Sequence, residues 1–273
     1  MFDKILGNVK NKVPLVHCIT NYVTVNDVAN IVLACGGSPV MADDDREAAQ
    51  ITSIADALYI NIGTLNSRTV NSMLLAGECA NKRGIPVVFD PVGAGASSLR
   101  TETAKKLIET LNISVIRGNI SEIKTLAGIS AATKGVDAAV SDTDDGALEN
   151  DISVAKKLAQ DTKAVVAISG EVDIITDGER VCLVKNGHID MTKITGTGCM
   201  LTGVVAAYCG ANKDDIFAAA VSAICAVGYC GEKAQIRMEN ENAGTSSLRM
   251  WMIDNIYRLT ADDLKEGAKY ELR

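Results

Sequence analysis

The feature that most constrains the fold of this chain is a regular alternation of short β-rich runs with helix-length segments from Leu58 onward. Each run is nearly continuous in valine and isoleucine and ends in a polar residue or a glycine; the runs span residues 58–63, 86–90, 114–118 and 164–170. Alternation of this kind predicts a parallel sheet covered by helices. Because continuous apolar runs are typical of strands buried on both faces, the sequence predicts a three-layer α/β/α fold.

The pattern changes after Gly170. Two short β-rich runs, 174–176 and 181–184, flank the dipeptide Asp177-Gly178, which is a strong signal for a tight turn. We therefore expect an antiparallel hairpin at one edge of the mainly parallel sheet. Beyond the hairpin the sequence predicts three helices, over about 199–209, 214–233 and 246–259, where aspartate and serine caps are available.

The chain shows no linker, repeat or low-complexity segment. Its 273 residues are 47% hydrophobic, which is enough for one large core. The polar stretch 141–146 is predicted to be a surface loop rather than a domain boundary. We interpret residues 1–273 as a single domain.

Charge and hydropathy exclude several classes of partner. The net charge is −7, with lysine and arginine scattered along the chain, so nothing predicts a surface for nucleic acid. No stretch reaches the ~18 uninterrupted apolar residues of a membrane helix, and the first residues lack the apolar region of a signal peptide. The cysteines lie far apart without C-x-x-C spacing, which predicts reduced, buried thiols and a cytoplasmic protein. They are Cys18, Cys35, Cys79, Cys182, Cys199, Cys209, Cys225 and Cys230.

A glycine-containing run, Thr195-Gly196-Thr197-Gly198-Cys199, directly precedes a predicted helix. The free N–H groups of a helix N-terminus attract anions, and glycines let a phosphate approach the backbone closely. An ordinary connecting loop is the alternative interpretation. The run is not a P-loop, because no G-x-x-x-x-G-K-[ST] occurs, and Leu201 takes the third glycine position of a dinucleotide motif.

Polar residues follow three of the predicted parallel strands. Ligands of open parallel sheets bind beyond the carboxyl ends of the strands, so Asp90, Arg117 and the pair Ser169-Gly170 are predicted to meet there. Asp90 opens a glycine-rich turn and is a candidate for holding hydrated Mg²⁺ or orienting phosphates, although Asp-Pro is also common in turns. The Arg117 guanidinium suits a phosphate oxygen.

Glu122 falls in the first turn of a predicted helix that begins near Asn119. Two interpretations stay open for it: a capping box with Asn119, and a ligand to a metal-bound water beside Asp90.

Cys199 lies in the first turn of the helix that follows the glycine run, a position that lowers the pKa of a thiol. It is a candidate weak general base for a substrate hydroxyl, and the alternative is a small buried side chain. His17 and His188 lack metal-ligand spacing and are predicted to be structural.

Nearly the whole chain resembles the hydroxyethylthiazole kinase family of the ribokinase-like superfamily. The most specific stretches are 14–24, with the sequence PLVHCITNYVT, and 37–42, with GSPVMA, which look like the thiazole-binding signature of that family. Later blocks match in order: 90–93, Arg117-Gly118-Asn119 with Glu122, 169–173, and 196–199. The resemblance implies a ribokinase-like fold.

The resemblance also implies ATP-dependent, Mg²⁺-assisted phosphorylation of 4-methyl-5-(2-hydroxyethyl)thiazole in thiamine biosynthesis or salvage. By position, Met41, Gly196 and Asn21 would contact the thiazole, and Arg117 and Ser169 the ATP. Asp90 and Glu122 would hold the metal and phosphates, and the run Gly196-Thr197-Gly198-Cys199 would form the catalytic loop. The family further implies a homotrimer with active sites between subunits.

Two departures and two alternatives accompany the resemblance. Ser169 stands where threonine is common, and 243–247 replaces a more usual Gly-Pro-Gly-Ser run; neither change removes a charged group. A kinase for a hydroxymethylpyrimidine or pyridoxal is one alternative, for which aspartate is expected at position 199. A non-catalytic nucleotide- or thiazole-binding regulator is the other.

Overall fold

The computed structural model describes residues 1–129 and 144–273. Its centre is a nine-stranded sheet of order β2-β1-β3-β4-β5-β6-β7-β8-β9. The strands are β1 (Leu15–Ile19), β2 (Ser38–Val40), β3 (Ala57–Asn61), β4 (Val87–Asp90), β5 (Val115–Asn119), β6 (Val165–Ser169), β7 (Asp173–Thr176), β8 (Val181–Val184) and β9 (Tyr270–Leu272).

Strand directions follow the sequence prediction in most respects. All pairs from β2 to β6 are parallel, while β6, β7, β8 and β9 pair antiparallel. The predicted hairpin around Asp177-Gly178 is confirmed as β7 and β8. It does not form the edge, because the exposed three-residue strand β9 pairs with β8. Three residues are too few to show a strand period, so the sequence did not reveal β9.

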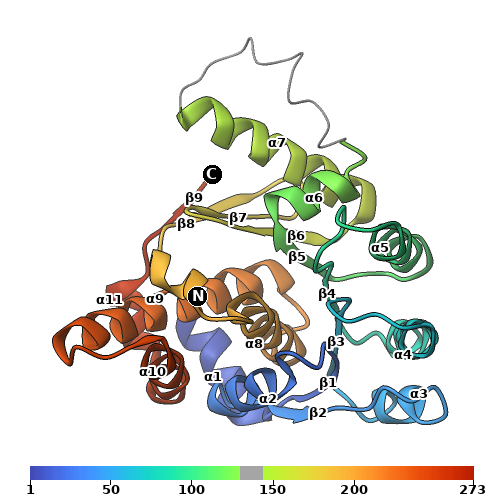
Figure 1. Cartoon of the computed structure of the whole chain (residues 1–273), viewed down its shortest axis with the longest axis horizontal. Coiled ribbons are helices and arrows are strands. Elements are labelled where there is room, and N and C mark those ends of the chain that lie inside the picture. The colour runs from blue at the N-terminus through green and yellow to red at the C-terminus, as the bar shows by residue number, and fades with distance from the viewer. Residues whose placement is uncertain (130–143) are drawn as a thin grey trace.

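Helices cover both faces of the sheet (Figure 1), which confirms the three-layer α/β/α prediction. One face carries α3 (Ala48–Thr52), α4 (Ser67–Arg83), α5 (Ser98–Thr110), α6 (Ile120–Leu126) and α7 (Asp144–Thr162). The other carries α1 (Phe2–Lys12), α2 (Val25–Ala34), α8 (Thr197–Ala211), α9 (Ile216–Asn240), α10 (Thr245–Arg258) and α11 (Ala261–Gly267). A 3₁₀ helix, η1 (Ile189–Lys193), precedes α8.

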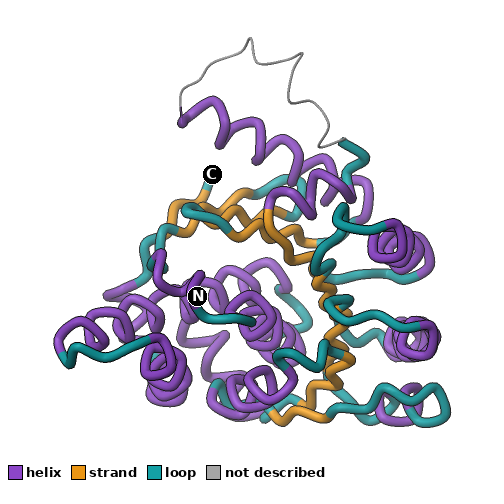
Figure 2. Tube along the Cα trace, in the orientation of Figure 1, coloured by secondary structure: helices purple, strands orange, loops and turns teal. Residues whose placement is uncertain are grey.

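Successive strand residues pack into different cores, as burial on both faces requires. In β3, Leu58 and Ile60 belong to the core under α3–α7, while Tyr59 between them belongs to the core under α8 and α9. All three are fully buried. Figure 2 shows the band of strands curving around the face that holds α8, and α8 packs against β1, β3 and β4.

The three predicted C-terminal helices are confirmed as α8, α9 and α10, with α9 extending to Asn240. The Asp215 side chain caps α9 by accepting a hydrogen bond of 3.1 Å from the Ala218 N–H. For the predicted loop over 141–146, residues 141–143 lie outside the described residues. The loop prediction is wrong for 144–146, because α7 begins at Asp144.

Helix α9 is long and apolar enough to cross a membrane by length and composition alone. However, 78% of its apolar window is buried inside the fold, so it is a core helix of this structure. The prediction of reduced thiols is confirmed, because all eight cysteines are free and only Cys79 is not buried.

Candidate active site

The glycine run leads into α8 at the carboxyl edge of the sheet. Gly196 is the N-cap residue and has φ of 85°, in the left-handed region that favours glycine. A Cβ on Gly196 would also collide with Thr24, and one on Gly198 would lie 3.0 Å from Arg117 Nη2. The Thr197 hydroxyl lies 2.8 Å and 2.9 Å from the carbonyl oxygens of Met191 and Ile194, which fixes the loop. The first N–H groups of α8, which have no partner within the helix, are thereby held ready for an anion.

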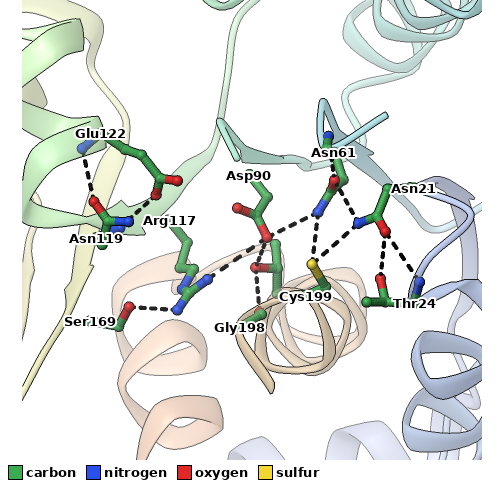
Figure 3. A network of polar contacts seen from close by, with 12 residues as sticks. Asn21, Thr24, Asn61, Asp90, Arg117, Asn119, Glu122, Ser169, Gly198 and Cys199 are labelled. Carbon is green, nitrogen blue, oxygen red and sulfur yellow. Dashed lines mark hydrogen bonds and ion pairs between the residues drawn. The ribbon is translucent and has the colours of Figure 1, made fainter. Parts of the chain in front are cut away.

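The predicted convergence of strand ends on this loop is confirmed. Arg117 on β5 places Nη1 3.8 Å from Asp90 Oδ2 at the end of β4, and its Nη2 donates a hydrogen bond to the Ser169 hydroxyl at the end of β6 (Figure 3). Arg117 Nε is buried and has no protein partner among the described residues. One guanidinium therefore joins three strands beside the N-terminus of α8.

Asp90 is fully buried. Its Oδ2 accepts hydrogen bonds from Thr202 Oγ1 at 2.8 Å and Asn61 Nδ2 at 3.2 Å, while its buried Oδ1 has no hydrogen-bond partner among the described residues. Burial raises the pKa of Asp90 to about 6, against the lowering effect of Arg117. An orphaned carboxylate oxygen of raised pKa fits a group that binds a cation or an ordered water.

Glu122 forms the predicted capping box. Its N–H donates to Asn119 Oδ1 at 2.9 Å, and its Oε2 accepts from the Asn119 N–H at 2.8 Å. The other oxygen, Oε1, accepts from the Gly93 N–H at 2.8 Å and so holds the turn that follows Asp90. The capping interpretation is confirmed, and each oxygen keeps a second lone pair for a metal-bound water.

The carboxylates suit Mg²⁺ only together with phosphates. In the part of the chain that the structure describes, no group of three or more His, Cys, Asp or Glu side chains is arranged to hold a metal. Mg²⁺ commonly uses one or two carboxylates, several waters and the phosphates of a nucleotide. Asp90, with its orphaned Oδ1, and Glu122 fit that mode.

Cys199 lies in the first turn of α8 with 8% of its surface exposed. Its Sγ accepts hydrogen bonds of 3.3 Å from both Asn21 Nδ2 and Asn61 Nδ2. The expectation that the helix N-terminus lowers the pKa of this thiol is wrong. Burial and the nearby Asp90 carboxylate raise the pKa of Cys199, and hydrogen bonds from Thr24, Asn21 and Asn61 only oppose the rise.

Two cavities lie near the glycine loop: residues 196–198 line the larger one, and the smaller one is connected to the loop through Asn61, whose side chain contacts Cys199. The larger, about 930 Å³, is lined by the polar residues Arg117 and Ser169, by residues 196–198, and by apolar residues that include Met191, Ile224 and Val227. The smaller, about 250 Å³, is lined on its apolar side by Met41, Ile19 and Met73 and on its polar side by Asn61, Thr20 and Thr64. The sizes suit a nucleotide and a small alcohol, respectively.

The residues predicted to contact the thiazole alcohol do not all line the same cavity. Met41 lines the smaller cavity, while Gly196 lines the larger one. Asn21 lines neither cavity; it is 4% exposed and its amide is directed at Cys199 (Figure 3). The structure thus brings Asn21 to the sulfur rather than to a cavity wall.

The structure adds residues that the sequence reasoning missed. Asn61 ends β3, and the rule that singled out Asp90, a polar residue at the end of a buried strand, would have found it. Thr202 bonds Asp90 from inside the apolar α8, and Tyr59 donates to the Cys199 carbonyl oxygen at 3.1 Å. No local pattern in the sequence signals these two contacts.

The histidines lie in different surroundings. His17 is fully buried on β1, with Nδ1 2.8 Å from Thr52 Oγ1 and Nε2 2.8 Å from the Ala42 carbonyl oxygen. This supports the prediction of a structural role. His188 lines the larger cavity and accepts a 3.2 Å hydrogen bond from the Asp190 N–H at the start of η1.

Comparisons with known proteins agree with this geometry. Residues 6–262 match the model of the "Hydroxyethylthiazole kinase family". A hydroxyethylthiazole kinase of Clostridium acetobutylicum is 52% identical over 272 residues, with 99% of each chain covered. The structure of a hydroxyethylthiazole kinase from Pyrococcus horikoshii OT3 superposes with a TM-score of 0.88 at 34% identity, covering 100% of this chain and 98% of that one.

A more distant structure supports the fold alone. A ribokinase-like superfamily protein from Enterococcus faecalis superposes with a TM-score of 0.60 at 11% identity, covering 92% of this chain and 89% of that one. The fold is therefore ribokinase-like. Given the family match, the full-length relatives and the shared arrangement of sheet and helices, this chain belongs to the hydroxyethylthiazole kinase family.

Proposed function

We propose that this protein transfers the γ-phosphoryl group of ATP to the hydroxyl of 4-methyl-5-(2-hydroxyethyl)thiazole, a step of thiamine biosynthesis or salvage. The observation that carries the proposal is a pair of cavities, of about 930 Å³ and about 250 Å³, that are connected by direct contacts. Residues 196–198 line the larger cavity, and Asn61, whose Nδ2 lies 3.3 Å from Cys199 Sγ, lines the smaller one. A kinase needs such an arrangement, because the nucleotide and the alcohol must meet at one point without water between them. The family membership supports the same reaction.

The nucleotide occupies the larger cavity in this proposal. Its phosphates lie beside Arg117, Ser169 and the N–H groups of residues 197 and 198, which bind them, and its base lies against the apolar residues of the same cavity. Asp90 and Glu122 would hold Mg²⁺, which would neutralise part of the phosphate charge. Arg117 and the α8 N-terminus stabilise the charge that develops on the transferred group, which is the main contribution of a protein to phosphoryl transfer.

The alcohol occupies the smaller cavity, where Met41 lies against the thiazole ring. The hydroxyl of the alcohol is directed to the glycine loop. Gly196 contacts the alcohol from the glycine loop. Asn21 does not contact the alcohol and influences the reaction through its hydrogen bond to Cys199. When the hydroxyl oxygen forms its bond to phosphorus, the bond between phosphorus and the bridging oxygen of ADP breaks. The hydroxyl proton passes to the Cys199 sulfur, which is the weak general base.

The test is an assay of the purified protein with ATP, Mg²⁺ and the thiazole alcohol. We expect ADP and the thiazole phosphate in equal amounts, and no phosphate ester in a reaction without the alcohol. A panel that includes a hydroxymethylpyrimidine and pyridoxal distinguishes the near alternative. Absence of ADP above background across a wide range of thiazole concentration would refute the proposal, and calorimetric binding without turnover would favour a regulator.

The carboxylates provide a second test. Asp90→Asn and Glu122→Gln remove charge with little change in shape, so each should raise the Mg²⁺ concentration required or lower kcat. Magnesium titration of the initial rate measures both effects. Unchanged kinetics in both variants would remove the metal role of these residues.

Assembly and compartment complete the proposal. Residues 1–273 act as one kinase domain, and three copies form a homotrimer with active sites between subunits, as the resemblance implies. Light scattering during gel filtration should give about 86 kDa, three times the 28.7 kDa of the chain. The protein acts in the cytoplasm, for which its free thiols are suited, and it needs no nucleic acid or membrane partner.

A further inference from the structure

Two buried side-chain amides are aimed at the Cys199 sulfur, and the orientation of each follows from its other contacts. Asn21 Oδ1 lies 3.1 Å from the N–H groups of Val23 and Thr24 and 3.1 Å from the Thr24 hydroxyl. Backbone N–H groups can only donate, so the oxygen of this amide faces them. The Asn21 Nδ2 group therefore faces Cys199 Sγ at 3.3 Å and Asn61 Oδ1 at 3.0 Å.

The second amide is oriented by the same reasoning. Asn61 Oδ1 accepts the Gly63 N–H at 2.9 Å, which places Nδ2 on the opposite side. There Nδ2 lies 3.3 Å from Cys199 Sγ, 2.9 Å from Tyr59 Oη and 3.2 Å from Asp90 Oδ2. The sulfur thus faces two N–H donors, and both belong to side chains with at most 4% exposure.

Cys199 itself lines neither of the two cavities, but two residues next to it do. Asn61 lines the smaller cavity, and the next residue before Cys199, Gly198, lines the larger one. The two N–H groups occupy two lone pairs of a thiolate, and a third lone pair stays available to accept the proton of a hydroxyl. Figure 3 shows both amides on one side of the sulfur.

We propose that Asn21 and Asn61 are positioning residues that hold the Cys199 sulfur as a hydrogen-bond acceptor, next to Asn61 of the smaller cavity and Gly198 of the larger one. The inference rests on the proposed kinase function. In the step concerned, the O–H bond of the alcohol breaks, an S–H bond forms on the Cys199 thiolate, and the oxygen electron pair forms the bond to phosphorus. The amides contribute by keeping the sulfur within reach of that proton.

A double-mutant cycle with Cys199→Ala tests this role directly. Asn21→Asp retains the oxygen that accepts from Val23 and Thr24 but replaces the donor that faces the sulfur. Asn61→Ala removes the second donor. In the wild-type background each variant should lower kcat roughly tenfold, the loss expected for one hydrogen bond of this kind, with KM for ATP unchanged within about twofold. In the Cys199→Ala background Asn21→Asp should not lower kcat further by more than about twofold, whereas Asn61→Ala should keep only the part of its loss that comes from its hydrogen bond to Asp90.

Asn212→Ala is the matched control. Asn212 is a buried amide at the other end of α8, where Nδ2 donates to the Tyr208 carbonyl oxygen at 2.9 Å and Oδ1 accepts from Asn8 at 2.7 Å. Its loss should lower Tm without lowering kcat. The control separates loss of a buried amide from loss of a donor to the sulfur.

Each outcome of the cycle decides the question. Equal fold-losses in the wild-type and Cys199→Ala backgrounds would show that the amides act elsewhere and would overturn the inference. The same holds if Cys199→Ala alone leaves kcat unchanged. A wild-type protein that forms no thiazole phosphate would refute the proposed function and this inference together, whereas an active protein without coupling would refute the inference alone.

Discussion

At the scale of single residues, Cys199 combines a favourable position with an unfavourable acidity. Its sulfur lies in the first turn of α8, but burial and the Asp90 charge raise the pKa of the thiol. Only the thiolate accepts a proton, so little of the protein is in the active form at pH 7. We therefore expect kcat to increase with pH through the alkaline range.

Replacement of this residue tests that expectation. Cys199→Asp should keep or raise kcat at pH 7, because an aspartate is ordinarily ionised there and can accept the same two amide hydrogen bonds. The rise of kcat with alkaline pH should also flatten. A pH series of initial rates measures both, with Cys199→Ala as the variant that lacks any base. Activity abolished by Cys199→Asp in a folded protein would contradict the base assignment.

Gly198 provides a prediction about the phosphate site. A side chain there would push directly into the Arg117 guanidinium, which would no longer bond Ser169 or approach a phosphate. Gly198→Val should lower kcat/KM for ATP by about 100-fold or more, the scale of losing one oriented stabilising group. Steady-state kinetics with varied ATP measure it. Gly244→Ala, where a Cβ meets nothing within 4 Å, is the control that should retain full activity.

At the scale of elements, two helix glycines have opposite surroundings. Gly77 in α4 faces Leu111, and an added Cβ would lie 2.8 Å from Leu111 Cδ2, whereas Gly7 in α1 faces open space. Gly77→Ala should lower the free energy of unfolding by about 1–3 kcal/mol through overpacking, while Gly7→Ala should raise it by up to about 1 kcal/mol.

Urea unfolding of both variants checks this pair, and kcat should stay unchanged in each because neither glycine lines a cavity. Leu111→Val should relieve part of the loss in Gly77→Ala, because it removes the atoms in collision. Equal effects of the two alanines would indicate that intrinsic helix propensity, rather than packing, determines stability at these positions.

The elements also show what local sequence can reveal. The strands β3 to β6 were predicted because each begins with consecutive apolar residues and ends in a polar residue. β1, β2 and β9 were not predicted. In β2 and β9 three residues cannot display a strand period, and β2 contains Pro39. β9 forms only because β8 offers it an unpaired edge, a condition that pairing across the fold creates.

At the scale of the whole molecule, the wall of the larger cavity includes Asp173, a carboxyl group whose ionisation opposes folding. Burial raises the pKa of Asp173 to about 6, against the Gly170 N–H bond and the charge of Arg117. Since the pKa in the unfolded chain is about 3.9, the folded protein binds this proton more tightly. The ionised group therefore destabilises the fold above about pH 6, and this penalty vanishes as the pH falls toward 4.

Asp173→Asn should accordingly raise the free energy of unfolding at pH 7 by roughly 1–3 kcal/mol and have little effect near pH 4. Urea unfolding at both pH values without nucleotide measures it. Asp177, on the same hairpin, has a pKa that is lowered rather than raised. Burial raises the pKa of Asp177, but hydrogen bonds from Arg180 and Glu179 outweigh that effect. Asp177→Asn should therefore lower the free energy of unfolding at pH 7. A higher free energy of unfolding in both Asp173→Asn and Asp177→Asn would contradict this account.

The sequence by itself determined the layers of the fold and the meeting of Asp90, Arg117 and Ser169. The reason is that apolar periodicity sets the elements, and parallel strands bring their carboxyl ends to one edge. It also placed Gly196 and Gly198 before α8, since both the turn and the phosphate approach need glycine.

Only the tertiary structure decided the surroundings of Cys199, which are its hydrogen-bond partners and the direction of its pKa shift. The amides of Asn21 and Asn61 reach the sulfur across 178 and 138 residues of sequence. Burial, not the helix terminus, fixes the direction of the Cys199 pKa shift, and Met41 and Gly196 fall in different cavities. Such features depend on which distant side chains share a small volume and exclude water from it, and no local pattern encodes that.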